Sequence, residues 1–254
     1  FLLDYFDYIW VHSNYVYKSI PNRYLFKVIK IPLPVEVHIP KKMDEINNDK
    51  FQVLTSFDLA STVTRKNPYG TIDAFTNAFS DNDNAELILK ISNGDIHRNR
   101  LSSLKSYIEN HNNIIIIDRH LKIEELHELY ASINCFISLH RSEGFGRNIA
   151  EMMLLKKPVV VTNFSGNVDF TLENNSYLIP FEEINLDVND YIFSKHQYWA
   201  EPNIEYASNV LLDIFKNGID ENKITNAYNL ISKKYNLNAS GEFRYKILKE
   251  YYEN

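Results

Sequence analysis

The chain has 254 residues, of which 44% are hydrophobic and 24% charged, values of a folded globular protein and not of a disordered or membrane-spanning chain. Its net charge of -6 argues against a nucleic-acid partner, because such proteins need a basic face to neutralise phosphates. The length suits one large α/β domain, or one domain with the remnant of another.

The residues before Phe51 predict one strand-helix-strand unit that ends in an extended segment. The apolar run YIWVHS precedes a short helical piece, and FKVIKIPLPVEVHIP follows it. The prolines of the second run indicate a linker between domains. The chain begins at Phe1 with neither a methionine nor a basic-then-apolar leader, so we expect a piece of a longer polypeptide and not a secretory precursor.

From Phe51 onward, short apolar runs alternate with amphipathic stretches, as strands and helices do around a parallel sheet. The predicted strands are FQVLTSF, ELILKIS, NIIIID, NCFISL, PVVVT and SYLIP. Helical spacing occurs in PYGTIDAFTNAF, where Pro68 suits a first turn, and in KIEELHELYASI. Right-handed crossovers then predict a doubly wound, Rossmann-like parallel sheet with its ligand at the carboxyl ends of the strands.

After Pro180, about twenty residues rich in Asn, Asp and Tyr interrupt this pattern, and two interpretations stay open: a functional loop or a floppy insertion. Helical spacing resumes in YWAEPNIEYASNVLLDIF, and two further helices are predicted in the final third. We assign residues 1–40 to the remnant of an N-terminal domain with its linker and residues 41–235 to the main Rossmann-like domain. Residues 236–254 form a helical extension expected to pack back toward the N-terminal part.

The cellular compartment is indicated by cysteine content and hydropathy. Cys135, the one cysteine, lies in the apolar run INCFISL and is expected to be a buried small hydrophobe, which suits a reducing compartment. No apolar run approaches the ~20 residues of a membrane span. We therefore expect a cytoplasmic protein, with at most peripheral contact with the inner face of the membrane.

The stretch RSEGFGRNIAEMMLLKKPVVVT places two glutamates around a Gly-Phe-Gly loop that lies between two predicted strands. A helix starting near Phe145 would direct its free N–H groups and positive dipole end at an anion above the sheet. Gly144 and Gly146 let the backbone approach a phosphate, whereas Glu143 suits sugar hydroxyls. Glu151 follows five helical residues after Gly146, ~7–8 Å along the axis, within reach of a ribose. Each acid alone also suits a solvated loop or helix position.

Several motifs resemble the donor site of family-four GT-B glycosyltransferases. E-G-F-G has a second glutamate eight positions after its first and is followed by KKPVVVTNFSGNVDF. The sequence resembles in particular a bacterial branch of the family, through the motifs FD, RKNP, two AF pairs, LHRSEGFG and WAEP in that order. These motifs stand at Phe57–Asp58, Arg65–Pro68, Ala74–Phe75, Ala78–Phe79, Leu139–Gly146 and Trp199–Pro202. The resemblance covers about Phe51 to Ala207 and implies the C-terminal, donor-binding half of a GT-B fold, with residues 1–40 as the remnant of the acceptor domain.

The resemblance also implies roles for the residues of the motifs. Glu143, Arg65 and Lys66 are the catalytic candidates: Glu143 positions the donor sugar, and Lys66 aligns with a lysine that grips the diphosphate. The family's arginine position falls near Ser61, a departure for which Arg65 could compensate by bidentate contact with phosphate. The candidates for donor and nucleotide binding are Glu151, Gly144, Phe145, Gly146, Arg147, Arg119, His120, Ser61, Gly166 and Asn167.

Within this set, Glu151 is implied to bind the ribose, and the amides that follow Glu143 the distal phosphate. Arg119 and His120 follow a predicted strand where the resembling family has its base pocket. Gly166 and Asn167, beside a Ser-Gly that replaces paired glycines, are expected to turn backbone toward the donor sugar. His140 is interpreted as a hydrogen-bonded structural residue and not as a base. Trp199 is interpreted as core in preference to a sugar platform.

The expected function is transfer of a sugar from a nucleotide-diphosphate sugar, GDP-mannose in preference to a UDP-sugar, with retention of configuration. The implied acceptor is a glycan or lipid-linked glycan, as in bacterial surface polysaccharide synthesis. The missing N-terminal domain would supply most acceptor contacts, so we expect this chain alone to bind donor without efficient turnover. No metal-ligand pattern stands out, and the resemblance implies neither a metal nor another cofactor.

Two other classes of function stay open. The first is a non-catalytic nucleotide-sugar binding module, or a degenerate domain within a larger synthase. The second is an epimerase or phosphorylase with a GT-B fold, although a phosphorylase would need a lysine environment for its cofactor that the sequence does not display.

Overall fold

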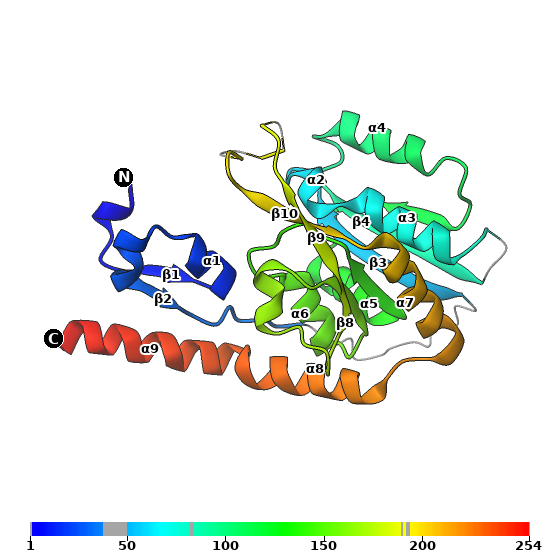
Figure 1. Cartoon of the computed structure of the whole chain (residues 1–254). Coiled ribbons are helices and arrows are strands. Elements are labelled where there is room, and N and C mark those ends of the chain that lie inside the picture. The colour runs from blue at the N-terminus through cyan, green and yellow to red at the C-terminus, as the bar shows by residue number, and fades with distance from the viewer. Residues whose placement is uncertain (1, 38–49, 82–83, 189, 192–193, 254) are drawn as a thin grey trace.

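The computed structural model describes residues 2–37, 50–81, 84–188, 190–191 and 194–253. A large α/β body makes up most of the molecule, and a small N-terminal unit lies beside it (Figure 1). Two consecutive helices at the C-terminal end follow: the first (Glu221–Lys234) lies along the body and the second (Leu237–Glu253) along the N-terminal unit. The predicted domain boundary between residues 40 and 41 lies outside the described residues. Within the described ranges, no helix is long and apolar enough to cross a membrane.

The body is built on a sheet of six parallel strands in the order β5-β4-β3-β6-β7-β8. The strands are β3 (Phe51–Asp58), β4 (Ala85–Ser92), β5 (Ile114–Ile117), β6 (Cys135–Ser138), β7 (Val159–Thr162) and β8 (Tyr177–Ile179). From β3 the chain builds outward through β4 to β5, then returns to β6 on the other side of β3. The carboxyl ends of β3 and β6 therefore flank the point where the strand order reverses, at which doubly wound sheets bind ligands.

Helices cover both faces of this sheet. They are α2 (Val63–Lys66), α3 (Pro68–Ala78), α4 (Arg98–Tyr107), α5 (Ile123–Ser132), α6 (Arg147–Leu154), α7 (Ile204–Asn217) and α8 (Glu221–Lys234). One apolar cluster joins the sheet to α3, α4 and α7, with Phe75 and Leu211 fully buried. The other joins it to α5, α6 and α8, with Met152 and Ile231 fully buried. Each such side chain contributes roughly 1.5–3 kcal/mol by leaving water. The predicted doubly wound, Rossmann-like fold is confirmed.

Asn67 fixes the turn that carries the RKNP motif. Its backbone is left-handed, with φ of 52°, and its side-chain oxygen accepts from the N–H of Gly70 to cap α3. Pro68 occupies the first turn of α3, as predicted, because its fixed φ suits that position. The side-chain amide of Asn67 also donates to the carbonyl of Leu139 at 2.9 Å, which ties this turn to the end of β6.

The segment after Pro180 is not only a loop. Strand β9 (Phe181–Asn185) pairs antiparallel with β10 (Tyr198–Pro202), so the two form a hairpin. The WAEP motif thus lies in a strand, where the sequence spacing suggested a helix, and α7 begins only at Ile204. Asn203 caps α7 by accepting from the N–H of Tyr206, which explains why the helix cannot extend back into the motif. Trp199 is 4% exposed, as predicted for a core residue.

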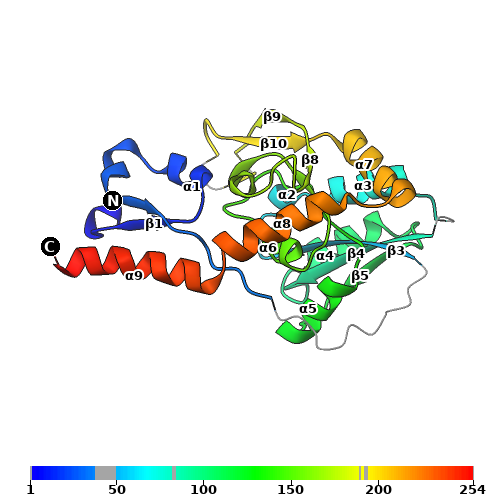
Figure 2. The same ribbon diagram turned by 90° about the horizontal axis from the view of Figure 1, so that it is seen from below.

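The N-terminal unit contains two parallel strands, β1 (Ile9–Val11) and β2 (Val28–Lys30), with helix α1 (Asn14–Ser19) between them along the chain. Short 3₁₀ helices, η1 (Leu2–Tyr5) and η2 (Asn22–Lys27), complete it. The C-terminal helix α9 (Leu237–Glu253) runs along this unit (Figure 2). Ser240 Oγ donates to the carbonyl of Pro32 at 2.6 Å, and the rings of Tyr8 and Tyr251 meet edge to face.

Candidate active site

A cavity of about 140 Å³ opens at the carboxyl ends of β3 and β6. Its lining residues come from both strand ends, the α2 turn, the loop after β6 and the start of α6, and they are Thr55, Ser56, Phe57, Lys66, Phe136, Ser138, Glu143, Gly146, Arg147, Asn148 and Ile149. This is the position at which the strand order reverses, so the fold itself leaves the cleft there.

Two cations and one carboxylate meet at one edge of this cavity. Lys66 Nζ donates to Glu143 Oε1, and Arg65 Nη1 lies 3.5 Å from the same oxygen. Burial acts to raise the pKa of Glu143, but the neighbouring positive charges, Lys66 foremost, outweigh it, and the pKa lies below its usual value. Glu143 is therefore ionised at neutral pH. The cluster carries a net charge of +1 when the two cations and this carboxylate are counted.

Arg65 is held in a bridging position between two loops. Its Nη1 donates to the carbonyl of Ser142 at 2.6 Å, and its Nη2 donates to Ser61 Oγ at 2.7 Å. The structure thus brings Ser61, Arg65, Lys66 and Glu143 together, as the sequence motifs predicted for one site. Ser61 enters the cluster as a hydrogen-bond partner of the arginine.

The amino end of α6 forms the opposite wall. Gly146 is the N-cap residue, with a left-handed φ of 91°, and it has no side chain with which to cap the helix. The first N–H groups of α6 and the positive end of its dipole therefore stay available to an anion in the cavity. The helix starts at Arg147, two residues later than the Phe145 start that the sequence suggested. Phe145 itself is 6% exposed and packs on Phe170 and Tyr235.

Glu151 reaches the cavity indirectly. Its Oε1 accepts from Arg147 Nε at 2.9 Å, and of these two described residues only Arg147 belongs to the cavity lining. Burial raises the pKa of Glu151, although Arg147 partly offsets this effect. Close to Glu151, Tyr130 donates from its hydroxyl to Ser56 Oγ at 3.3 Å, and Ser56 lines the cavity. Glu143 therefore lines the cavity, whereas Glu151, which was predicted to share the same cleft, does not line it and reaches it only through its hydrogen bond with Arg147.

Gly166 supports the Glu143 loop from behind. Its N–H donates to the carbonyl of Glu143 at 2.8 Å, and a Cβ on Gly166 would lie only 2.1 Å from the carbonyl oxygen of Gly144. Ser165 Oγ accepts from the N–H of Glu143 at 2.8 Å. Only glycine permits this close approach of two loops, and the approach holds the backbone of Glu143 in place.

His140 is a buried structural residue, as interpreted from the sequence. Its Nε2 lies 2.9 Å from Asn167 Oδ1, which can only accept, so this nitrogen carries the proton. Nδ1 then accepts from Ser138 Oγ at 3.0 Å. Burial lowers the pKa of His140 and keeps the imidazole neutral. Both ring nitrogens are therefore committed to the packing of the loop.

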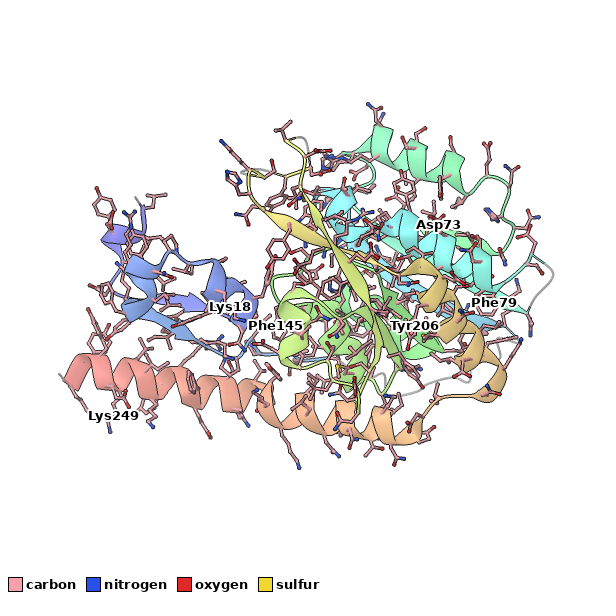
Figure 3. All side chains as sticks on the ribbon, in the orientation of Figure 1. Lys18, Asp73, Phe79, Phe145, Tyr206 and Lys249 are labelled. Atoms are coloured by element: carbon pink, nitrogen blue, oxygen red, sulfur yellow. The ribbon has the colours of Figure 1, made fainter. Side chains whose placement is uncertain are left out.

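The N-terminal unit touches the loop of the site. Ser13 Oγ donates to the carbonyl of Gly144 at 2.5 Å, and Ser142 Oγ donates to the hydroxyl of Tyr15 at 3.1 Å. Figure 3 shows Lys18 of α1 on the side of that unit that faces Phe145, which precedes α6 by two residues. The loop after β6 is thus enclosed between the N-terminal unit and the Gly166 segment.

Comparison with known proteins shows the family to which the chain belongs. The family model described as "Glycosyl transferases group 1" matches residues 43–192, more than half of the chain. The chain belongs to this family. No curated protein matches it.

Solved structures of low identity share the fold of this member of the group 1 family. Anabaena Alr3699/HepE, in complex with UDP and glucose, is 14% identical with a TM-score of 0.73, over 96% of this chain and 63% of that chain. A glycosyltransferase from Rickettsia africae is 19% identical with a TM-score of 0.75, over 98% and 64%. The pneumococcal O-GlcNAc transferase GtfA, in complex with UDP and GlcNAc, is 16% identical with a TM-score of 0.69, over 99% and 46%.

Identities this low show the fold alone, which is that of the C-terminal, GT-B type domain expected from the motifs. The chain spans less than two thirds of the length of these three proteins.

Some of the predicted site residues lie apart from the cavity. Arg119 and His120 follow β5, two strands away from β3, and both are exposed; Arg119 Nη1 lies 3.0 Å from Glu125 Oε1. Gly166 and Asn167 lie behind the loop of Glu143, and among the described residues neither lines the cavity. The side chain of Asn167 is committed to His140 and to the carbonyl of Thr162.

Sequence reasoning assigned no role to Arg141, Glu201 or Asn67, although each belongs to a quoted motif. Arg141 binds Glu201 through two hydrogen bonds of 2.7 and 2.8 Å, which joins LHRSEGFG to WAEP. Asn67 joins RKNP to the end of β6. The presence of all three motifs in one chain was the signal that could have pointed to these residues. Their spacing along the sequence, however, does not predict that the motifs contact one another in the fold.

Among the described residues, no group of three or more His, Cys, Asp or Glu side chains could hold a metal ion. Cys135 is fully buried in β6, and burial raises the pKa of its thiol.

Proposed function

We propose that the chain is the donor-binding half of a retaining glycosyltransferase that transfers a sugar from a nucleotide-diphosphate sugar. The observation that carries this proposal is the cavity in which Lys66, Glu143 and the uncapped start of α6 face one another. A diphosphate needs positive charge and N–H donors, and this cavity offers both within a fold that binds ligands at the same place.

The cavity size indicates which part of the donor it holds. Pockets that enclose a whole small-molecule ligand begin at roughly 300 Å³. The cavity here measures about 140 Å³, so it suits the phosphates and part of the sugar. The nucleoside would then lie along the start of α6, where Arg147 and Glu151 are available to its ribose. Arg119 and His120 remain our proposed contacts to the base, at the end of β5.

The proposed chemistry is departure of the nucleotide from the same face on which the acceptor attacks. Negative charge develops on the leaving diphosphate, where Lys66, Arg65 and the amides of Gly144–Arg147 would stabilise it. Glu143 is ionised and can accept hydrogen bonds from the sugar hydroxyls, which orients the anomeric carbon. His140 is neutral and fully hydrogen-bonded, so we assign it no proton transfer. Retention follows the resemblance to family-four enzymes.

The identity of the donor is open to two proposals. The motifs resemble a branch that suggests GDP-mannose, whereas structures of similar fold were solved with UDP, glucose or GlcNAc. We propose a UDP-sugar first and GDP-mannose second. The proposed acceptor is a glycan or lipid-linked glycan of a bacterial surface polysaccharide, bound mainly by an N-terminal domain, in the cytoplasm and at most at the inner face of the membrane. We further propose that the cations and amides replace a divalent ion in donor binding, so EDTA would leave nucleotide affinity unchanged.

Calorimetric titration of the chain with UDP, GDP, ADP and TDP tests this proposal. One nucleotide should bind clearly better than the others, and Lys66→Ala should weaken its binding tenfold or more, since a desolvated hydrogen bond to phosphate is lost. Lys105→Ala, on the exposed side of α4, is the matched control and should bind as the wild type does. Absence of binding by all four, or full binding by Lys66→Ala, contradicts the proposal.

Measurement of sugar transfer by the full-length protein distinguishes an enzyme from a non-catalytic binding module. There, Glu143→Ala should abolish sugar transfer without weakening nucleotide binding. A full-length wild type that binds a nucleotide sugar, yet neither hydrolyses nor transfers it, would instead favour a binding module.

A further inference from the structure

We propose that Glu201 is a positioning residue, which holds Arg65 and Lys66 against the diphosphate through Arg141. This role rests on the proposed donor binding. It assigns a function to the WAEP motif and to the β9–β10 hairpin, which the candidate site leaves without one.

Arg65 and Lys66 belong to α2, a helix that is too short to be stable by itself. Helix α2 has only 4 residues, and a single turn is unstable in water because nucleation is unfavourable. Its last carbonyl groups need donors from elsewhere. Arg141 supplies two: its backbone N–H donates to the carbonyl of Arg65 at 2.8 Å, and its Nη1 donates to the carbonyl of Thr64 at 2.8 Å.

Glu201 fixes the guanidinium that makes the second of these bonds. Arg141 Nε donates to Glu201 Oε2 at 2.7 Å, and Nη2 donates to Oε1 at 2.8 Å, so the pair is bidentate. The hairpin also binds the backbone of the same residue, because the N–H of Ala200 donates to the carbonyl of Arg141 at 3.1 Å. Arg141 is thus held on several sides, and its guanidinium has one orientation in which it caps α2.

The consequence concerns the site and not overall stability. The Arg141 and Glu201 side chains are 18% and 36% exposed, so water reaches the pair and its loss should lower the free energy of unfolding by only about 1 kcal/mol. Lys66 is the last residue of the α2 turn and lines the cavity directly. A turn that frays moves this ammonium away from a phosphate while leaving the start of α6 unchanged. Loss of Glu201 should therefore weaken contacts with the distal phosphate more than contacts with the nucleoside.

The test compares UDP with UMP, and GDP with GMP, by calorimetry on the chain as it stands. For Glu201→Gln, we expect the preference for diphosphate over monophosphate to fall about five- to tenfold, the effect of one misplaced charged donor. The melting temperature should change by less than about 3 °C. Glu183→Gln, on β9 of the same hairpin and exposed, makes the same change of charge and should keep the wild-type preference.

A second variant keeps the inference testable if Glu201→Gln folds poorly. Arg141→Lys retains the charge but lacks the planar fork, so it should lose the same preference. Wild-type preference in both variants would overturn the positioning role while leaving the donor site intact. Failure of the wild type to bind any of these nucleotides would overturn the donor site itself, and this role with it.

Discussion

Replacement of Glu143 by glutamine should increase the affinity of the chain for a free nucleoside diphosphate. In the structure, Glu143 Oε1 pairs with Lys66 Nζ and lies 3.5 Å from Arg65 Nη1. The carboxylate therefore neutralises positive charge that would otherwise attract the diphosphate. The substitution keeps the shape of the side chain and removes its charge. It raises the net charge of the three-residue cluster from +1 to +2, counted over Arg65, Lys66 and position 143.

The size of the effect follows from the electrostatics of a partly open cavity. One unit charge ~5 Å from a phosphate, at an effective dielectric constant between 20 and 80, is worth ~1–3 kcal/mol. The three side chains are between 14% and 21% exposed, so salt screens part of this energy. We expect the lower end, about 1 kcal/mol, which is roughly a fivefold increase in UDP affinity.

Calorimetric titration with UDP at two salt concentrations measures this change. The affinity of Glu143→Gln should fall more steeply with salt than that of the wild type, since more positive charge faces the phosphates. Glu128→Gln, on the exposed side of α5, is the matched control and should not alter binding. Equal or weaker UDP binding by Glu143→Gln would refute the idea that Glu143 and the diphosphate compete for the same cations.

Three further predictions concern groups around the loop. Burial raises the pKa of Glu151, so the ionised carboxylate destabilises the fold above the unfolded pKa near 4.5. Denaturant titration should therefore show Glu151→Gln to be more stable than the wild type at pH 7 and equal to it at pH 4. Burial lowers the pKa of His140, so the imidazole binds a proton more readily in the unfolded chain, and the free energy of unfolding should decrease as pH falls below ~6.5. His140→Gln should flatten this dependence of the unfolding free energy on pH. An unchanged dependence would contradict the assignment of a buried, neutral His140. Gly166→Ala should lower the melting temperature by several degrees and weaken UDP binding, because its Cβ would lie 2.1 Å from the Gly144 carbonyl oxygen, while Gly241→Ala, with nothing within 4 Å, should be neutral or stabilising.

The parallel sheet could be predicted because its strands are short apolar runs that are buried on both faces. The eight residues of β4, for example, include seven that are buried. Helix α4 is hard to predict from its sequence, since it buries only Leu101 and Leu104 and has no broad apolar stripe. The β9–β10 hairpin was missed for a related reason: β9 is exposed at Glu182, Glu183 and Asn185, so its polar sequence is typical of a loop.

The site could be predicted where chemistry and motif coincide. Lys66 and Glu143 are 77 positions apart, and only the resemblance placed them together, which the structure confirms. The contact of Arg147 with Glu151 follows directly from helical spacing of four residues and could have been expected. The Arg141–Glu201 pair could not, because residues 60 positions apart meet only through the hairpin that the sequence pattern did not disclose.

A crystal structure of the chain with UDP, or with GDP if that nucleotide binds better, tests the central claim most directly. The account predicts that the diphosphate lies in the cavity at the ends of β3 and β6, with Lys66 and the first N–H groups of α6 within hydrogen-bond distance of its oxygens. A nucleotide bound elsewhere on the chain, with Lys66 still paired to Glu143, would contradict it.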